Sequence, residues 1–258
     1  MKTVKTLFFA LLVLAITPMA TAQTADEILD NYFENTGGKD AWNAIKSIKA
    51  EGKADFGGQI FNFVTTLMLD GRMAIEIDLQ GQTFIPEAFD GEKQWRTNFQ
   101  SMKAEAVDEE TSTNYKRNEA NEFPDPFLNY SDNGYSIELL GEEIVEGVET
   151  YKIKLNKNPI VVDGKEEDLF VIYYFDKENF VPILQESTVP SGPQKGVKVE
   201  TTFSDYQEAG DIFYPYSVGI KYNGQLAQSI SIENIEINSE IEDALFVMPE
   251  GETDEKKD

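Results

Sequence analysis

The sequence predicts a mainly β protein with some α-helix, built as a curved, antiparallel, half-open β-barrel with N-terminal helices and a helical lid insertion. Apolar and polar residues alternate over many short runs, as in strands with one buried face. Turn signals such as Asp90-Gly91 and Asn223-Gly224 separate these runs at short spacing, which favours hairpins over helix-connected parallel strands. In residues 59–69 and 169–175, apolar side chains occupy both the odd-numbered and the even-numbered positions, which point to opposite faces of a strand. Such strands need cover on both sides, from helices or from a ligand.

Residues 1–22 have the pattern of a secretory signal peptide. Lys2 and Lys5 precede an apolar stretch at 7–16, and Ala20-Thr21-Ala22 is an A-x-A site that predicts cleavage after Ala22. The apolar stretch is too short to span a bilayer, which needs about 20 residues. A lipid anchor at the cleavage site needs a cysteine, and the sequence has none. We therefore expect an exported, periplasmic protein without a lipid anchor.

The remaining 236 of the 258 residues are enough for one large domain, which we place at 23–250. Thr24 and Glu27 form a capping-box pattern, and the helix that follows ends at Gly37-Gly38. A second short helix is expected at 39–45. The charged residues 251–258 are expected to be a disordered tail.

The strands that follow have a period of two. Residues 72–80, 151–156 and 197–203 each alternate between apolar and polar side chains. In residues 228–238 the apolar phase slips between Ile232 and Ile235, which predicts a β-bulge near Glu233-Asn234.

An acidic segment at 101–133 interrupts this pattern. It contains Pro124-Asp125-Pro126 and few β-branched residues, and we expect short helices around 113–120 and 126–130. A segment of this length between hairpins is long enough to form a lid or flap.

Composition excludes most familiar catalytic sites. The chain has no histidine and no cysteine, so it lacks the ordinary general base near neutral pH, a thiolate nucleophile and Cys/His metal ligands. The net charge of −25 becomes −27 when the leader, with Lys2 and Lys5, is removed. Nucleic acids and anionic lipid surfaces would repel such a polyanion. We expect no metal and no cofactor.

Carboxylate chemistry is the main catalytic possibility that remains. Pairs such as Glu109-Glu110 and Glu166-Glu167 are adjacent in sequence, so strand geometry would point their side chains to opposite faces. Calcium-loop, nucleophile-elbow and phosphate-loop motifs are absent from the sequence. A carboxylate-dependent hydrolase or lyase on an envelope polymer stays as an alternative, and it predicts a polar cleft with two inward carboxyl groups.

The surplus of apolar strand residues favours a container. A curved sheet with a helical flap would enclose an apolar interior that can hold hydrophobic ligands, although an ordinary sealed core fits the same pattern. The residues that we predict to line the wall of this interior come from two-sided or alternating strands. They are Phe61, Phe63, Leu67, Leu69, Met73, Ile75, Ile77 and Trp95.

Several short motifs resemble those of the periplasmic lipoprotein carrier family with the LolA/LolB-like fold, in its Bacteroidetes-type outer membrane lipoprotein-sorting members. Asp90-Gly91-Glu92-Lys93-Gln94-Trp95 is similar to the family's D-G-x-x-L-W hairpin, with Gln94 in place of Leu. Phe246-Val247-Met248-Pro249-Glu250-Gly251 is similar to its F-x-x-P-x-G ending. Gly37-Gly38, Asp205-Tyr206 and residues 210–215 follow the family's order along nearly the whole mature chain.

The resemblance implies an open barrel with a lid, and a cavity for lipoprotein acyl chains. Better-known members hold the lid with an arginine in a K-R-P-x-x-F turn, and the nearest match here is Arg72, without the proline. Arg72 is therefore the candidate lid latch. However, it shares a strand parity with Glu76 and Asp78, which places it toward solvent if the apolar parity faces the cavity.

We therefore predict a non-catalytic periplasmic carrier of lipoprotein acyl chains or another hydrophobic ligand. As a soluble shuttle it would be a monomer and would meet membrane-bound donor and acceptor proteins. The alternatives are the carboxylate-dependent enzyme and a structural β-domain that binds a protein partner, which would have a sealed core and an exposed apolar patch.

Overall fold

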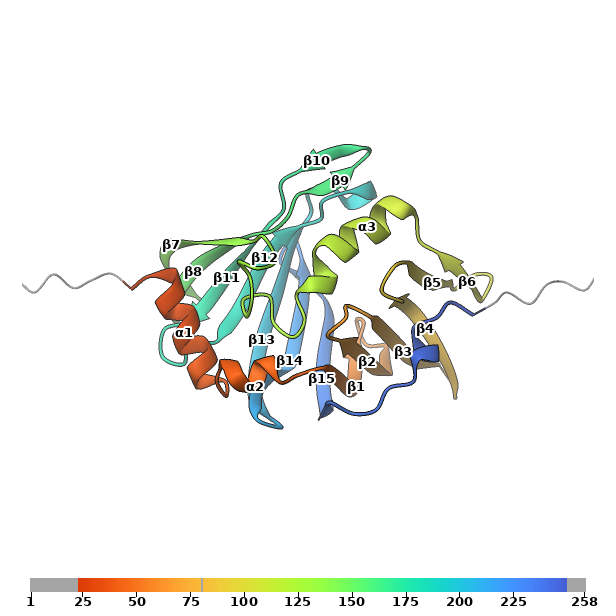
Figure 1. Ribbon diagram of the computed structural model, residues 1–258, viewed down its shortest axis with the longest axis horizontal. Helices are drawn as coiled ribbons and strands as arrows, with labels where there is room; N and C mark the ends of the chain where they lie inside the picture. Colours follow the sequence, from red (N-terminus) through yellow and green to blue (C-terminus); the bar gives the residue numbers. More distant parts are fainter. Residues whose placement is uncertain (1–22, 80, 250–258) are drawn as a thin grey trace, which may run out of the picture.

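The dominant element is one antiparallel sheet of thirteen strands in the part of the chain that the structure, a computed structural model, describes: residues 23–79 and 81–249 (Figure 1). Its two edge strands are not paired with each other, so the sheet curves without closing, as predicted. The predicted leader at 1–22 and tail at 251–258 lie outside the described residues. Across the sheet, the strands are β6 (Lys103–Ala106), β5 (Gln94–Asn98), β4 (Gln82–Phe89), β3 (Met73–Leu79), β2 (Ile60–Met68), β1 (Ser47–Asp55), β15 (Gln225–Ile237), β14 (Ile212–Tyr222), β13 (Lys198–Ala209), β12 (Pro182–Thr188), β11 (Phe170–Asp176), β8 (Val148–Asn156) and β7 (Ser136–Val145).

The pairing of β1 with β15 contains the predicted bulge. Glu51 lies opposite Asn234, whereas the next residue, Gly52, lies opposite Ile232, so Glu233 is the extra residue. Gly52 is required there because a Cβ atom would lie 2.1 Å from the carbonyl oxygen of Ser231. A bulge increases local twist, and this one lies at the centre of the strand order.

Two helices follow the predicted start of the domain. In α1 (Ala25–Asn35) the capping box is present, because Thr24 Oγ1 accepts from the Glu27 amide and the Glu27 side chain accepts from the Thr24 amide. Gly37 has a φ of +115°, and a Cβ atom there would lie 2.2 Å from the Asp211 carbonyl oxygen. This close approach packs the turn between α1 and α2 (Lys39–Asn43) against the loop between β13 and β14. Trp42 of α2, which follows the turn, is buried in the core.

The insertion differs in part from the prediction. Its first part is strand β6, and its helices are α3 (Glu109–Arg117) and the 3₁₀ turn η1 (Glu119–Asn121). Residues 126–130, predicted as a helix, form turns because Asp125 bonds the Phe127 amide in an Asx-type geometry. Asp108 caps α3 by accepting from the Thr111 amide. The prediction missed β6 because its residues, Lys-Ala-Glu-Ala, have low strand propensity.

The remaining short elements lie outside the main sheet. The hairpin β9 (Ile160–Val162) and β10 (Lys165–Glu167) pairs by itself, and η2 (Gly192–Gln194) and η3 (Asp243–Leu245) are 3₁₀ turns. The Asn114 side chain of α3 bonds both the amide and the carbonyl of Val161 in β9. The described helices are all too short or too polar to traverse a lipid bilayer.

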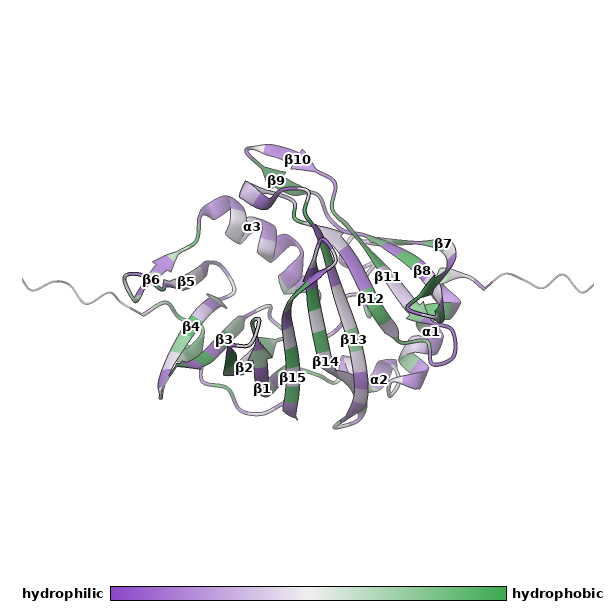
Figure 2. Cartoon of the chain, turned by 180° about the vertical axis from the view of Figure 1, so that it is seen from behind, coloured by the Kyte–Doolittle hydropathy of each residue, from purple (hydrophilic) through white to green (hydrophobic). Residues whose placement is uncertain are grey.

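Helices α1, α2 and α3 all lie on one side of the curved sheet, which we call its inner face (Figure 1). Seen from behind, the outer face exposes β13, β14 and β15, where hydrophilic and hydrophobic residues alternate (Figure 2). The main core lies under α1 and α2 and includes Phe33, Trp42 and Phe175. A smaller cluster of Ala74 and neighbouring residues packs around Phe246 on the outer face.

Candidate functional site

Five of the predicted wall residues share the inner face of the sheet, at the end that contains β2 and β3. Leu67 lies opposite Met73, and Phe63 lies opposite Ile77, with Ile75 between them at the same parity. Met73 is also opposite Phe89, whose ring is 4.8 Å from that of Tyr115 in α3. The side chains that share the face of Met73 therefore point toward the helices. Phe63 and Met73 are buried, whereas Leu67, Ile75 and Ile77 remain half-buried.

The other three predicted wall residues lie elsewhere. Phe61 has the inner parity but lies at the rim, where it is half-buried against Phe56. Leu69 lies beyond the end of β2 and is 55% exposed. Trp95 pairs with Ala88, on the parity opposite to Phe89, and its Nε1 donates to the Phe246 carbonyl at 2.7 Å. Trp95 therefore belongs to the outer cluster and does not share a face with the other predicted wall residues.

Arg72, the candidate lid latch, also contacts the C-terminal segment. Its Nε donates to Asp70 at 2.9 Å, its Nη1 donates to Asp243 at 2.6 Å, and its guanidinium lies 4.8 Å from the centre of the Phe246 ring. These contacts fasten residues 243–246 to the outer face of the sheet. They give no support to the prediction that Arg72 holds the lid.

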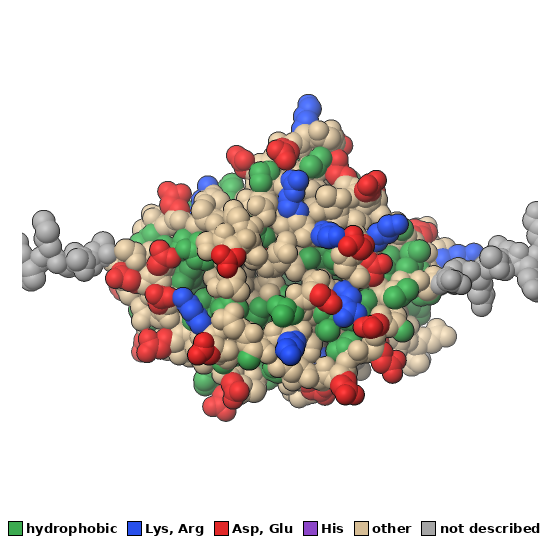
Figure 3. Space-filling view, viewed as in Figure 1, with side chains coloured by type: hydrophobic (Ala, Val, Ile, Leu, Met, Phe, Trp, Pro, Cys, Tyr) green, Lys and Arg blue, Asp and Glu red, His purple; other side chains and the backbone are tan. Residues whose placement is uncertain are grey.

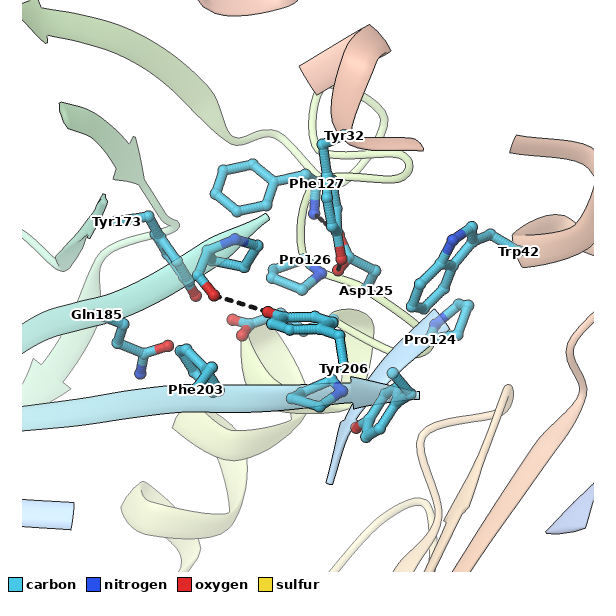
Figure 4. A pocket seen from close by; sticks show the side chains of 14 residues that line it. Tyr32, Trp42, Pro124, Asp125, Pro126, Phe127, Tyr173, Gln185, Phe203 and Tyr206 are labelled. Atoms are coloured by element: carbon cyan, nitrogen blue, oxygen red, sulfur yellow. Dashed lines mark hydrogen bonds between the residues drawn. The ribbon is translucent and has the colours of Figure 1, made fainter. Parts of the chain in front are cut away.

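The structure places a cavity of about 240 Å³ between α1, α2, the insertion and the inner face of β11–β14. Side chains from all of these elements converge on it (Figure 4). Most of the lining is aromatic or proline, with two carboxyl groups and one amide. The lining residues are Tyr32, Trp42, Glu122, Pro124, Asp125, Pro126, Phe127, Tyr173, Pro182, Gln185, Phe203, Tyr206, Tyr214 and Pro215.

Asp125 is the central polar group of this cavity. Its Oδ2 accepts from the Tyr32 hydroxyl at 2.7 Å, and its Oδ1 accepts from the Phe127 amide at 2.8 Å. Burial raises the pKa of Asp125 to about 6, although both hydrogen bonds oppose that shift. Burial and the nearby Asp125 charge also raise the pKa of Tyr32 and bring that of Tyr214 to about 12. Asp125 thus joins the insertion to α1.

Glu122, the second carboxyl group, is neutralised by a partner. It forms an ion pair with Lys157, whose side chain is only 6% exposed, and it accepts from the Tyr135 hydroxyl at 3.4 Å. Both carboxyl groups of the cavity are therefore already bonded to protein groups. This arrangement suits binding better than the paired acid and base across an open cleft that the hydrolase alternative needs.

Sequence reasoning did not assign the cavity residues to a site. Tyr32 and Trp42 lie within the two predicted N-terminal helices, and Asp125 lies within the predicted insertion. The available signals were Pro124-Asp125-Pro126, which places a carboxyl group between two rigid residues, and the aromatic residues near Asp205-Tyr206. No sequence pattern predicts that these segments meet, because they are up to 183 positions apart, from Tyr32 to Pro215.

The raised pKa of Asp125 predicts a specific dependence of stability on pH. Because the folded state binds this proton more tightly than the unfolded chain, where the ordinary value is 3.8, the stabilisation is full below about pH 4 and is lost as the pH rises through 6. The shift corresponds to about 3 kcal/mol. Urea unfolding between pH 4 and 7.5 should show that the Asp125→Asn variant lacks this part of the pH dependence.

The comparison with Asp125→Asn isolates one group from the other acids of the chain. Tyr32, Tyr206, Tyr214 and Glu122 face Asp125 and are unchanged in the variant. Parallel stability curves for the two proteins across this pH range would contradict the assignment of the shift to Asp125.

Comparisons with known proteins identify the fold. No protein-family model and no curated protein sequence matches the chain. A putative outer membrane lipoprotein-sorting protein domain from Vibrio parahaemolyticus matches its structure with a TM-score of 0.54 at 12% identity, over 85% of this chain and 94% of that one. LolA superfamily protein NE2245 from Nitrosomonas europaea matches with a TM-score of 0.53 at 12% identity, over 88% and 98%. The fold implied by the sequence resemblance is therefore confirmed.

Proposed function

We propose that this protein is a non-catalytic carrier of lipidated or otherwise hydrophobic ligands, which it holds against the inner face of the sheet. The observation that carries the proposal is the incomplete cover of this face. Leu67, Ile75 and Ile77 point to the side of the helices yet remain half-buried, whereas sheet residues in the core under α1, such as Ile153 and Phe175, are fully buried. A sealed structural domain would bury both sets alike.

An acyl chain would complete the burial of this face. Each CH₂ group moved from water into an apolar site contributes about 0.8 kcal/mol, so a chain of ordinary length gains several kcal/mol. No covalent step is needed, which agrees with a chain that has no histidine or cysteine. The two solved structures described above, whose names refer to lipoprotein sorting and to the LolA superfamily, support a carrier role.

The proposed setting is the periplasm. The expected leader would export the chain, and without a cysteine the mature protein would carry no lipid anchor. Acidic side chains are spread around the face that carries the helices, with apolar patches between them (Figure 3). Such a surface disfavours direct adsorption to anionic lipid, so transfer would rely on membrane-bound donor and acceptor proteins.

The test uses a fluorescent fatty-acid probe and two matched lysine variants. Ile77→Lys places a charge on the inner face, opposite Phe63 and Phe84. Val64→Lys, from a residue that is likewise β-branched and half-buried, places it on the outer parity, opposite Glu51 and Glu76. We expect Ile77→Lys to weaken probe binding about 10-fold or more, because the site would bury an unpaired ammonium group, and Val64→Lys to bind normally.

Copurifying material provides a second measurement. Native mass spectrometry of the protein purified from an envelope fraction should show a lipid or acylated adduct that organic solvent removes. If the purified protein carries no such adduct and the probe does not bind the unmodified protein, the carrier proposal is wrong. Equal loss of probe binding in both lysine variants would contradict the placement of the ligand on the inner face.

A further inference from the structure

The cavity beside α1 and α2 has an unusual combination of lining groups. Seven of its fourteen lining residues are aromatic and four are prolines, yet it also contains Asp125 and Glu122. Neither lysine nor arginine is among the described residues that line it. A site for an acyl chain has no use for a carboxylate, and a site for an anionic headgroup would have basic side chains. The lining therefore points to a positively charged ligand group.

The aromatic rings are held so that they form walls of this cavity. The Tyr206 hydroxyl donates to the Pro182 carbonyl at 2.6 Å, and the Tyr32 hydroxyl donates to Asp125. The Trp42 ring lies 6.3 Å from that of Tyr32 and 6.5 Å from that of Tyr214. Figure 4 shows the Tyr206, Tyr32 and Trp42 rings around the Pro124-Asp125-Pro126 segment. Because two hydroxyls are engaged, the rings offer mainly their π surfaces to a ligand.

The net charge of the cavity lies on Asp125. Lys157 compensates Glu122, whereas the partners of Asp125 are neutral, namely the Tyr32 hydroxyl and the Phe127 amide. An ionised carboxylate with neutral partners in an apolar site attracts a cation strongly, because the surroundings screen its charge poorly. The aromatic faces add attraction through the negative side of their quadrupoles.

We propose that this cavity binds an alkylated ammonium group, with the aromatic rings around the cation and Asp125 as its counter-charge. This site rests on the proposed function in one respect: if the ammonium group is the headgroup of a lipid, the attached acyl chain would lie along the inner face of the sheet. A small free ammonium compound offers the same chemistry without the chain. A divalent cation is a poorer fit, because the described residues contain no group of three acidic side chains arranged to hold a metal.

An alkylated ammonium group fits better than one rich in N–H donors. Both Asp125 oxygens already accept hydrogen bonds, and Gln185 is the one amide side chain among the described residues of the lining. A trimethylammonium group needs no hydrogen-bond acceptor and packs its methyl groups against ring faces and prolines. Aromatic surroundings with a nearby carboxylate are the usual recognition chemistry for such groups.

The experiment compares choline with 3,3-dimethylbutan-1-ol, which has the same shape without the charge, by isothermal titration calorimetry. We expect choline to bind at least about 10-fold more tightly than this neutral analogue. Asp125→Asn should weaken choline binding about 10-fold and leave the neutral analogue unaffected. Phe203→Leu, which removes a half-buried ring but keeps an apolar side chain, should weaken choline binding more than Phe170→Leu, a matched change at a ring outside the cavity.

A second arm separates a lipid headgroup from a free cation. Lysophosphatidylcholine and lysophosphatidylglycerol, both below their micelle concentrations, compete with the fluorescent fatty-acid probe. Stronger competition by the choline lipid, lost in Asp125→Asn, supports a headgroup site. Choline binding without competition by either lipid supports the ammonium site as a site for a small free compound and counts against the carrier proposal.

Two results would overturn the inference. The first is equal affinity for choline and its neutral analogue, and the second is choline affinity that neither Asp125→Asn nor Phe203→Leu changes. If the two lipids also compete equally well, acyl-chain binding stands while the ammonium site fails, so the two proposals can be rejected separately.

Discussion

Replacing Trp42 with alanine is expected to lower the free energy of unfolding by about 3–5 kcal/mol, the usual cost of removing a large buried aromatic side chain. Trp42 is 1% exposed and packs against Tyr32, Phe33 and Tyr214, so it joins α1, α2 and the sheet. Chemical unfolding followed by circular dichroism measures the change.

Trp42→Phe provides the matched control. It keeps a ring in the core but removes the Nε1 donor, which bonds the Thr36 carbonyl at 3.2 Å and the Thr36 hydroxyl at 3.1 Å. We expect it to cost about 1–3 kcal/mol, from the loss of these buried hydrogen bonds together with a small volume loss. The Thr36 carbonyl still accepts from the Phe213 amide, and the Thr36 hydroxyl still donates to the Tyr32 carbonyl. A cost for Trp42→Ala below that of Trp42→Phe would contradict the role of Trp42 as the packing centre of this core.

Breaking the ion pair between Glu122 and Lys157 is the second change with a large expected effect. Lys157→Met should lower the free energy of unfolding at neutral pH by about 3–5 kcal/mol, because it leaves Glu122 as an uncompensated charge in a mostly apolar site. The side chains of Lys157 and Glu122 are 6% and 19% exposed, so solvent screens the pair only weakly. Urea unfolding at low and high salt provides the measurement.

The double variant Glu122→Gln/Lys157→Met tests the same point from the other side. When both charges are removed together, much of the lost stability should return, since neither partner is then buried alone. The coupling energy between the two sites should exceed about 1 kcal/mol. Additive effects of the two single changes would show that the pair does not interact as its geometry indicates.

Local features of the fold follow from the sequence with good accuracy. The Thr24–Glu27 capping box, the end of α1 near Gly37 and the bulge at Glu233 are all where the pattern predicts them. Each depends on residues that are near one another in sequence. Chain-local geometry and the period of apolar residues are enough to decide them.

The candidate site was only partly predictable, because its residues are far apart in sequence. Strand parity correctly groups Phe63, Leu67, Met73, Ile75 and Ile77 on one face. Parity cannot be carried from one strand to the next without the register, so Trp95 could not be assigned to a face from sequence. The parity that Arg72 shares with Glu76 and Asp78 did predict its face correctly, since the structure places it opposite to the face of Met73, but not its contacts. In the structure both contact Phe246, about 150 positions or more along the chain.

The sequence by itself thus determined the chemistry that is possible and the class of fold. A chain without histidine or cysteine and with two-sided apolar strands indicates a curved sheet around an apolar interior. The tertiary structure alone decided where that interior lies and what it contains. It brings Tyr32, Trp42, Asp125 and Tyr206 to one cavity. Contacts between segments so far apart depend on register, sheet curvature and helix docking, which are set by the packing of the whole core and by no local pattern.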